Sequence, residues 1–276
     1  MARKPAPRRN KAGTKVRNTR KRIVDAPRSA REHASLTTNP CDVPMKYEDF
    51  EFIRFDRHPD GVLLATLNRP EAMNATNARL HWELTQLWGV VQNDPMTKVI
   101  VVTGAGDRAF SAGGDLALVD SMVGDPAKVD VVMREASDIV YNMLACDKPI
   151  ISAINGTAVG AGLAVALLAD ISIIAEEARL TDGHVRIGVS AGDHAAIVWP
   201  LLCGVAKAKY YLMTAEFIDG REAERIGLVS LCEPRERLLG RALEVAAQLA
   251  RGSQAAIRAT KKSLSNWMRA DRKSVV

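Results

Sequence analysis

Short runs of branched apolar residues alternate with longer helical segments from about residue 46 onward, and this alternation restricts the fold more than any other feature. Three runs are bounded by Gly, Pro or Asp: KVIVVTG at 98–104, KPIISAIN at 148–155 and DISIIA at 170–175. Strands that are buried on both faces of a sheet have this composition. Two earlier runs, YEDFEFIRFDRH and GVLLATLN, meet at PDG (59–61) and predict a β-hairpin. The pattern therefore predicts an α/β fold.

Helical segments separate the strands and close the chain. Between residues 77 and 94 the larger apolar residues fall on one helical face, and Asn77 is placed to cap the start of that helix. The stretches 236–250 and 253–270 each carry an apolar stripe at helical spacing. We expect them to form a closing pair of helices whose stripes serve packing.

The excess of basic residues lies at the N-terminus. Residues 1–35 hold twelve of the 38 lysines and arginines but only two of the 32 acidic residues, so the rest is mildly acidic. Because large apolar residues are almost absent there, we predict a basic, disordered extension over 1–45. We favour a solvated extension; an organellar transit peptide and an arm that binds nucleic acid are the alternatives.

The cysteines and the apolar stretches indicate a cytoplasmic protein. The four cysteines show neither a CxxC pair nor the spacing of metal ligands, so we expect reduced thiols and no metal site. The longest apolar stretches of the sequence stop well short of a bilayer span, and we predict no membrane insertion.

Two turns rich in small residues are suited to chemistry with main-chain atoms. One is FSAGGD at 110–115, and the other lies within INGTAVGAGLAVALLAD at 154–170, where an apolar helix is predicted to begin. A helix N-terminus exposes unpaired N–H groups and the positive end of the helix dipole. One N–H group from each turn would form an oxyanion hole. Tight packing is the alternative explanation for either turn alone.

These stretches together resemble the crotonase superfamily, the enoyl-CoA hydratases and isomerases. The stretch at 154–170 matches its signature, and NRPEAMNA, VVTGAGDRAFSAGGDL, DKPIISAING and TAEFIDGREAERIGLVS resemble its other motifs in the same order. The likeness runs from about residue 50 to 270. It implies a β-β-α spiral core, expected over 46–233, and a C-terminal helical segment over 234–276 that forms a homotrimer or a hexamer.

The resemblance also implies a substrate and the groups that bind it. The substrate would be an acyl-CoA thioester, so that coenzyme A enters with the substrate and no separate cofactor is expected. The oxyanion-hole donors would be the N–H groups of Gly114 and Ala161. Ala75 and Ala112 would lie along the bound coenzyme A. Asp115 would lie at the substrate site and, like Asp170, is expected to be a cap or a turn partner near these loops.

The sequence departs from the superfamily at the two positions where hydratases carry catalytic glutamates. Ala164 stands at the first and His184 at the second. A neutral imidazole takes up a proton near physiological pH, so His184 is the candidate general base and Asp193 its orienting partner. For both, a structural role is the alternative. We read Asp182 as a turn residue, with an acid role as its alternative, and His194 as structural.

Three functions stay open. The favoured one is an enzyme of hydratase or isomerase type that uses His184 in place of the usual glutamate. The second is a hydrolase of retro-Claisen type, in which water activated by His184 and Asp193 cleaves a β-diketone or a β-keto acyl-CoA. The third, and least favoured, is an RNA-binding homologue that uses the basic N-terminal arm.

Overall fold

The computed structural model describes residues 45–192, 194–266 and 268. The predicted N-terminal extension lies outside these residues except for Met45, and with it the arm considered for nucleic-acid binding. Asp193 also lies outside them. Within them, the three cysteines Cys146, Cys203 and Cys232 form no disulfide.

Six strands form the larger sheet, in the order β1-β2-β3-β5-β7-β10. They are β1 (Ile53–His58), β2 (Val62–Leu67), β3 (Val99–Gly104), β5 (Ile150–Ile154), β7 (Ile171–Ala175) and β10 (Leu231–Glu233). The predicted hairpin is confirmed, because β1 and β2 are antiparallel neighbours. The other neighbours run parallel. The three predicted apolar runs are the central strands β3, β5 and β7, which are almost fully buried.

A second sheet holds four shorter strands, in the order β4-β6-β8-β9. They are β4 (Ala109–Ser111), β6 (Thr157–Val159), β8 (Arg179–Thr181) and β9 (Ile218–Asp219). The first three run parallel, and only β9 is antiparallel to its neighbour. Because parallel strands place their carboxyl ends at one edge, the loops that follow β4, β6 and β8 lie next to one another.

Eight α-helices are described. They are α1 (Ala78–Asn93), α2 (Leu116–Met122), α3 (Pro126–Ala145), α4 (Gly160–Leu168), α5 (His194–Thr214), α6 (Gly220–Arg225), α7 (Arg235–Arg251) and α8 (Gln254–Leu264). The predicted apolar face of α1 is confirmed, since its members are fully buried: Leu80, Leu84, Leu87, Trp88 and Val91. Asn77 caps this helix by accepting a hydrogen bond from the Leu80 N–H at 2.8 Å.

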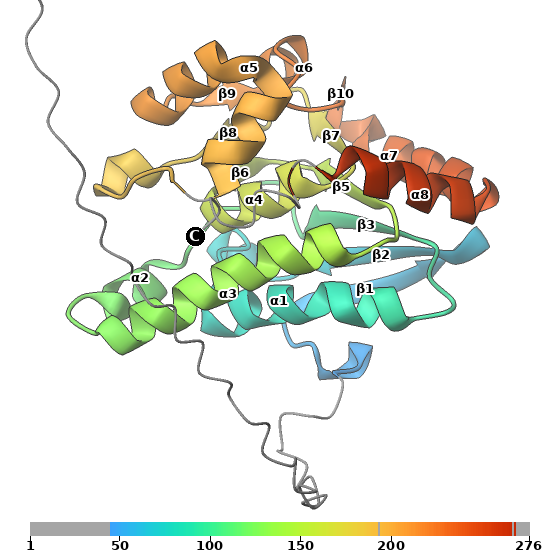
Figure 1. Cartoon of the computed structure of the whole chain (residues 1–276), viewed down its shortest axis with the longest axis horizontal. Coiled ribbons are helices and arrows are strands. Elements are labelled where there is room, and N and C mark those ends of the chain that lie inside the picture. The colour runs from blue at the N-terminus through green and yellow to red at the C-terminus, as the bar shows by residue number, and fades with distance from the viewer. Residues whose placement is uncertain (1–44, 193, 267, 269–276) are drawn as a thin grey trace, which may run out of the picture. The chain divides into compact units, whose positions relative to one another are not determined.

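The helices cover the larger sheet. Figure 1 shows α1 and α3 side by side along their length. The predicted closing pair is confirmed as α7 and α8, and α7 packs on β2, β3, β5 and β7. The prediction that both apolar stripes serve packing is wrong for α8 within the single chain, because this helix ends at Leu264 and that side chain is 73% exposed. The fold is therefore the predicted α/β fold. No helix in the described ranges has both the length and the apolar character needed to cross a membrane.

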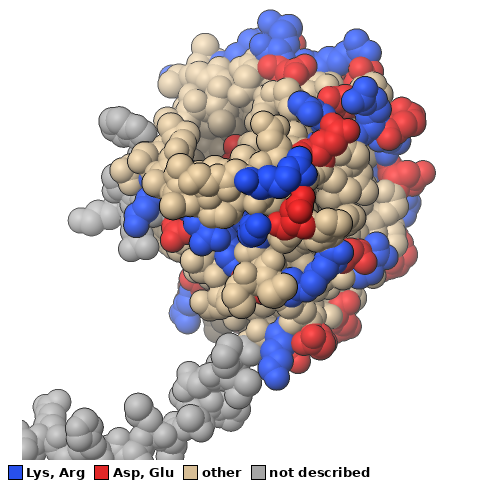
Figure 2. All heavy atoms as spheres, turned by 90° about the vertical axis from the view of Figure 1, so that its right-hand side faces the viewer, with Lys and Arg blue, Asp and Glu red and all other residues tan. Residues whose placement is uncertain are grey.

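The surface charge of the described residues is mixed. On the face shown in Figure 2, acidic and basic side chains are interspersed. This agrees with the near balance of charge that the sequence has beyond residue 35.

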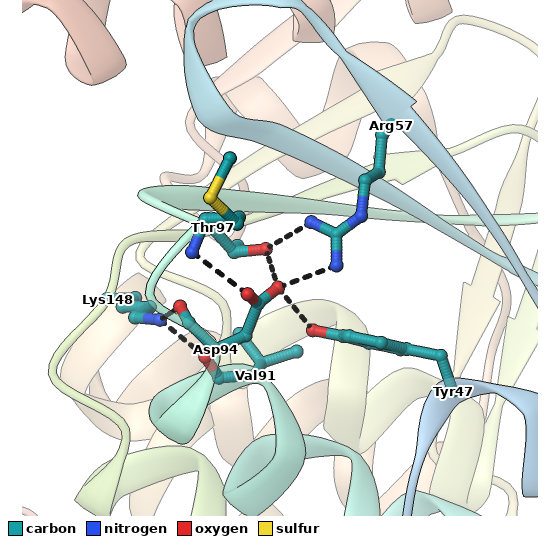
Figure 3. A network of polar contacts seen from close by, with 7 residues as sticks. Tyr47, Arg57, Val91, Asp94, Thr97 and Lys148 are labelled. Carbon is teal, nitrogen blue, oxygen red and sulfur yellow. Dashed lines mark hydrogen bonds and ion pairs between the residues drawn. The ribbon is translucent and has the colours of Figure 1, made fainter.

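A network of polar side chains closes the C-terminal end of α1 (Figure 3). The Asp94 carboxylate accepts hydrogen bonds from the side chains of Tyr47, Arg57 and Thr97, at 2.9, 3.0 and 2.5 Å. The buried ammonium group of Lys148 donates to the main-chain oxygens of Val91 and Asp94. These carbonyl groups lie at the end of the helix, where the donors four residues further on are missing. Each also accepts one longer main-chain bond, from the N–H groups of Asp94 and Thr97 at 3.3 and 3.2 Å. The network thus ties the end of α1 to β1 and to the segment before β5.

Candidate active site

Three loops leave the carboxyl ends of β4, β6 and β8 and form the candidate site. They are residues 112–115, residues 160–161, which follow β6 directly and form the first turn of α4, and residues 182–184; we call all three loops. β6 pairs with β4 on one side and with β8 on the other, so the second loop lies between the other two. Ligands of parallel α/β sheets bind at this kind of edge. Most of the residues singled out in the sequence lie here.

The first loop turns the Gly114 amide away from Thr76, which lies beside it in the 69–77 loop. Thr76 forms a parallel β-bridge with Gly114, in which the Thr76 N–H donates to the Gly113 oxygen at 2.7 Å. The Asp115 N–H returns a bond to the Thr76 oxygen at 3.0 Å. In a parallel bridge the central residue points its own N–H and C=O to the opposite side. The Gly114 N–H therefore faces away from Thr76.

The second loop places Ala161 at the start of α4. Val159 is the N-cap residue and its side chain makes no capping hydrogen bond. The Ala161 N–H is one of the first four of the helix and so has no intrahelical acceptor. The helix dipole adds positive potential at this point.

The first and second loops touch each other at two glycines. A Cβ atom on Gly113 would lie 3.1 Å from the Val159 oxygen, and one on Gly160 would lie 3.7 Å from the Gly113 Cα. Gly113 has φ +87° and Gly160 has φ +49°, which side chains disfavour. The structure thus brings together the two turns that carry the predicted donors.

The loop at 69–77 lies beside the first turn. The Ala112 N–H donates to the Met73 oxygen at 3.0 Å, and both Ala75 and Ala112 are half-buried. Asn74, which sequence reasoning missed, is fully buried with φ +54°. Its amide donates to the oxygens of Ala105 and Ala109, both at 2.9 Å. An Asn is one of the few residues that adopt this conformation readily, and that is the signal that could have revealed it.

Asp115 has the capping role that the sequence predicted. Its Oδ1 accepts a hydrogen bond from the Ala117 N–H at 3.1 Å and so caps α2. Its Oδ2 pairs with Arg69 Nη1 at 3.1 Å.

Asp170 is a structural partner, but its predicted place near the loops is wrong. It follows the C-terminal end of α4, roughly 13 Å along the helix from Ala161. There it accepts a hydrogen bond from the Ile150 N–H at 2.7 Å and pairs with Lys261 Nζ at 2.8 Å. Burial raises the pKa of Asp170, although Lys261 opposes that effect.

The third loop carries His184 at the start of a short 3₁₀ helix, His184–Ile187. The preceding Gly183 has φ +77°, and a Cβ atom there would lie 3.2 Å from Val159 Cγ1. The main chain just before His184 therefore lies beside the start of α4. Its side chain is 23% exposed.

Asp182 is the described partner of the His184 ring. Its Oδ2 lies 2.8 Å from His184 Nδ1 and 3.4 Å from the His184 main-chain nitrogen. The second contact fits the predicted turn role, and the first orients the imidazole. The Asp182 side chain is 1% exposed. A carboxylate at Nδ1 favours the tautomer with the proton on Nδ1, which leaves Nε2 as the basic nitrogen. The predicted partner Asp193 lies outside the described residues.

The remaining candidates differ in their surroundings. Ala164 is buried in α4, one turn after Ala161, so no carboxylate occupies that position. His194 is buried at the first turn of α5, as expected of a structural residue. In the part of the chain that the structure describes, no group of three His, Cys, Asp or Glu side chains could hold a metal ion.

Known proteins resemble this chain over most of its length. Residues 57–275 match the family "Enoyl-CoA hydratase/isomerase". A crotonyl-CoA hydratase from Syntrophomonas wolfei is 32% identical over 74% of this chain and 78% of its own length. An (E)-benzylidenesuccinyl-CoA hydratase from Thauera aromatica is 35% identical over 73% of this chain and 78% of its own length. A crystal structure of an enoyl-CoA hydratase/isomerase from Mycobacterium paratuberculosis superposes with a TM-score of 0.76 and 34% identity, covering 81% and 89% of the two chains.

Proposed function

We propose that this chain, which belongs to the enoyl-CoA hydratase/isomerase family, acts on an acyl-CoA thioester through an enolate held by the Gly114 and Ala161 N–H groups. The observation that carries the proposal is the contact between the two turns that bear these donors, beside a histidine oriented by a buried carboxylate. Placed donors of this kind lower the barrier to an enolate by several kcal/mol. The substrates named for the relatives support an acyl-CoA thioester.

Hydration of a 2-enoyl-CoA is the favoured reaction. His184 Nε2 takes a proton from water while the water oxygen attacks Cβ. The electron pair of the double bond moves through Cα to the thioester oxygen, which lies between the two donors. The protonated His184 then returns the proton to Cα. Because Ala164 offers no second carboxylate, one residue serves as both base and acid.

Cleavage of a carbon–carbon bond is the second candidate, and the buried Asp182 beside His184 favours it. A histidine held by a carboxylate is suited to activate water for attack on a ketone. In that reaction hydroxide adds to the ketone carbon of a β-diketone or a β-keto acyl-CoA. The bond to the neighbouring carbon breaks, the enolate enters the same pair of donors, and His184 protonates the carbon.

The assembly that we propose is a homotrimer or a hexamer. Several large apolar side chains of α5 and α8 are exposed in the single chain, among them Leu201, Val205, Met213 and Leu264. Exposed apolar patches of this kind mark interaction surfaces. A groove of about 290 Å³ between α4, α5 and α8 adds to this surface. Sedimentation equilibrium would measure the number of chains.

The proposal is tested by turnover of crotonyl-CoA, followed as the loss of enoyl absorbance. We expect His184→Ala to lower kcat by about a hundredfold or more, the contribution of a general base. His58→Ala, at the end of β1, is the matched control and should leave kcat unchanged. Absence of hydration together with cleavage of a β-diketone that requires His184 would support the second candidate. Absence of both reactions in the folded wild-type protein would overturn the proposal.

A further inference from the structure

The side chain of Arg69 is held beside the candidate oxyanion hole from several directions. It is 14% exposed, and its Nη1 donates to both the Ala75 oxygen and Asp115 Oδ2. The guanidinium lies 5.2 Å from the centre of the Phe52 ring, which stacks against it. The Arg69 N–H also donates to the buried Asn74 Oδ1 at 2.9 Å. The side chain therefore has one defined position.

The two acceptors of Arg69 Nη1 flank the bridge that orients Gly114. Ala75 comes directly before Thr76, and Asp115 comes directly after Gly114. One nitrogen atom thus joins the 69–77 loop to the 112–115 loop, through two residues, Arg69 and Asp115, that lie 46 positions apart in the chain. The same bridge is reinforced by Thr76, whose N–H and Oγ1 both donate to the Gly113 oxygen.

Gly114 depends on such neighbours for its orientation. It has no side chain, and it follows Gly113, so the backbone of this turn has wide conformational freedom. We infer that Arg69 is a positioning residue that fixes the direction of the Gly114 N–H by tying the Ala75 oxygen to the Asp115 side chain. The inference rests on the proposed function, in which that N–H binds the thioester oxygen. Arg69 itself does not touch the reacting atoms.

The chemistry of the guanidinium suits this position. It is planar and permanently charged, it stacks on an aromatic ring, and its donors are fixed in direction. A lysine could reach one of the two acceptors but would not stack in the same way. We therefore expect Arg69→Lys to recover part of the function that Arg69→Met loses.

Two measurements test the inference on the full chain. The first is steady-state kinetics with the acyl-CoA that the wild-type protein turns over, which separates an effect on kcat from an effect on KM. The second is the absorbance of bound cinnamoyl-CoA, a conjugated thioester whose band moves to longer wavelength when hydrogen bonds polarise its carbonyl. We expect Arg69→Met to lower kcat by about tenfold to a hundredfold, to change KM by less than about threefold, and to reduce the shift of the band.

Arg57→Met is the matched control. Arg57 also pairs with a carboxylate, that of Asp94 at 3.0 Å, and also lies 5.2 Å from an aromatic ring, that of Tyr47. It lies at the far end of α1, away from the three loops. We expect it to leave kcat and the shift unchanged.

A second variant covers the case in which Arg69→Met does not fold. In Asp115→Asn the side-chain oxygen can still cap α2, while the amide group replaces the acceptor of Arg69. The same two readouts should fall, by a smaller factor. A folded Arg69→Met or Asp115→Asn protein with wild-type kcat and a wild-type shift would overturn the inference. A wild-type protein that neither turns over an enoyl-CoA nor shifts the band would overturn the proposed function and this inference with it.

Discussion

The two ends of α1 hold polar clusters of opposite kinds. At the C-terminal end, the Asp94 carboxylate accepts hydrogen bonds from three side chains and Lys148 covers two helix-end carbonyl groups (Figure 3). Before its N-terminal end, Thr76 forms a β-bridge with Gly114 in the first of the three loops, which carry the proposed donors Gly114 and Ala161. In the third of these loops, Asp182 Oδ1 is buried and has no hydrogen-bond partner among the described residues.

The two clusters differ in whether their buried polar groups all have partners, and we assign them different roles: the closed cluster in stability and the open cluster in function. A buried polar group with all its partners stabilises a unique arrangement, whereas an unpaired one costs about 1–3 kcal/mol. The closed network at Asp94 contributes to holding the fold. The open cluster at the three loops contains one buried carboxylate oxygen without a described partner, and buried groups of this kind are found where a ligand or water binds. We therefore expect substitutions in the open cluster to act mainly on turnover and those in the closed network mainly on unfolding.

The largest effect is expected at Asp182. In Asp182→Asn the amide no longer favours the proton on Nδ1 of His184, and we expect kcat/KM to fall by about a hundredfold with little loss of stability. Asp193→Asn is the comparison, because Asp193 was the partner predicted from the sequence. Steady-state kinetics of both variants would decide between them. A larger loss in Asp193→Asn than in Asp182→Asn would show that the described contact is not the one that matters.

A smaller effect is expected at Gly113, where the first two loops touch. An alanine there would have φ +87° and would place its Cβ 3.1 Å from the Val159 oxygen. We expect a loss of about 1–2 kcal/mol in the free energy of unfolding and about a tenfold loss of kcat, because the two donors would separate. Gly124→Ala is the control: φ is +77° but no atom lies within 4 Å. Equal losses of kcat in both variants would contradict the role of the contact.

The Asp94 network should show its effect as a dependence of stability on pH. Burial raises the pKa of Asp94, but the hydrogen bonds from Thr97, Met96, Tyr47 and Arg57 together lower it to about 2, from an ordinary 3.8. The carboxylate therefore contributes stability that is fully present above pH 3.8 and is lost as the pH falls through 2. That contribution is on the order of 2 kcal/mol.

Urea unfolding between pH 7 and about pH 2 would measure this contribution, because the window of loss lies between the two pKa values of 3.8 and about 2. We expect Asp94→Asn to be less stable than the wild type at pH 7 and to approach it as the pH falls. Asp56→Asn is the control, because the Asp56 carboxylate is 49% exposed and pairs only with the exposed Arg54 among the described contacts. If the wild type and Asp94→Asn differ in their free energy of unfolding by the same amount at every pH, the ionised carboxylate is not the source of that difference.

The sequence was sufficient to predict the parts of the molecule that local patterns determine. The central strands, the hairpin and the face of α1 follow from apolar periodicity, and the two turns follow from their small residues. The contact between Asp182 and His184 could not be predicted, because it depends on the left-handed Gly183 and on burial. The Asp94 network likewise joins residues 47 to 148, which only the folded chain brings together.

Two arginines with nearly the same contacts give the last and smallest prediction for stability. Arg57 and Arg69 each pair with a carboxylate and each lie 5.2 Å from an aromatic ring, but Arg57 is 50% exposed and Arg69 is 14% exposed. An exposed ion pair contributes less than about 1 kcal/mol and is screened by salt. We expect Arg57→Met to lower the free energy of unfolding, measured in urea, by no more than this amount, because Tyr47 and Thr97 still donate to Asp94. In high salt the loss should be smaller. A loss above about 2 kcal/mol that salt does not change would mean that Arg57 is an integral part of the closed network. The contrast with Arg69 would then lie in whether the neighbouring cluster is open or closed, and not in the exposed fraction of the side chain.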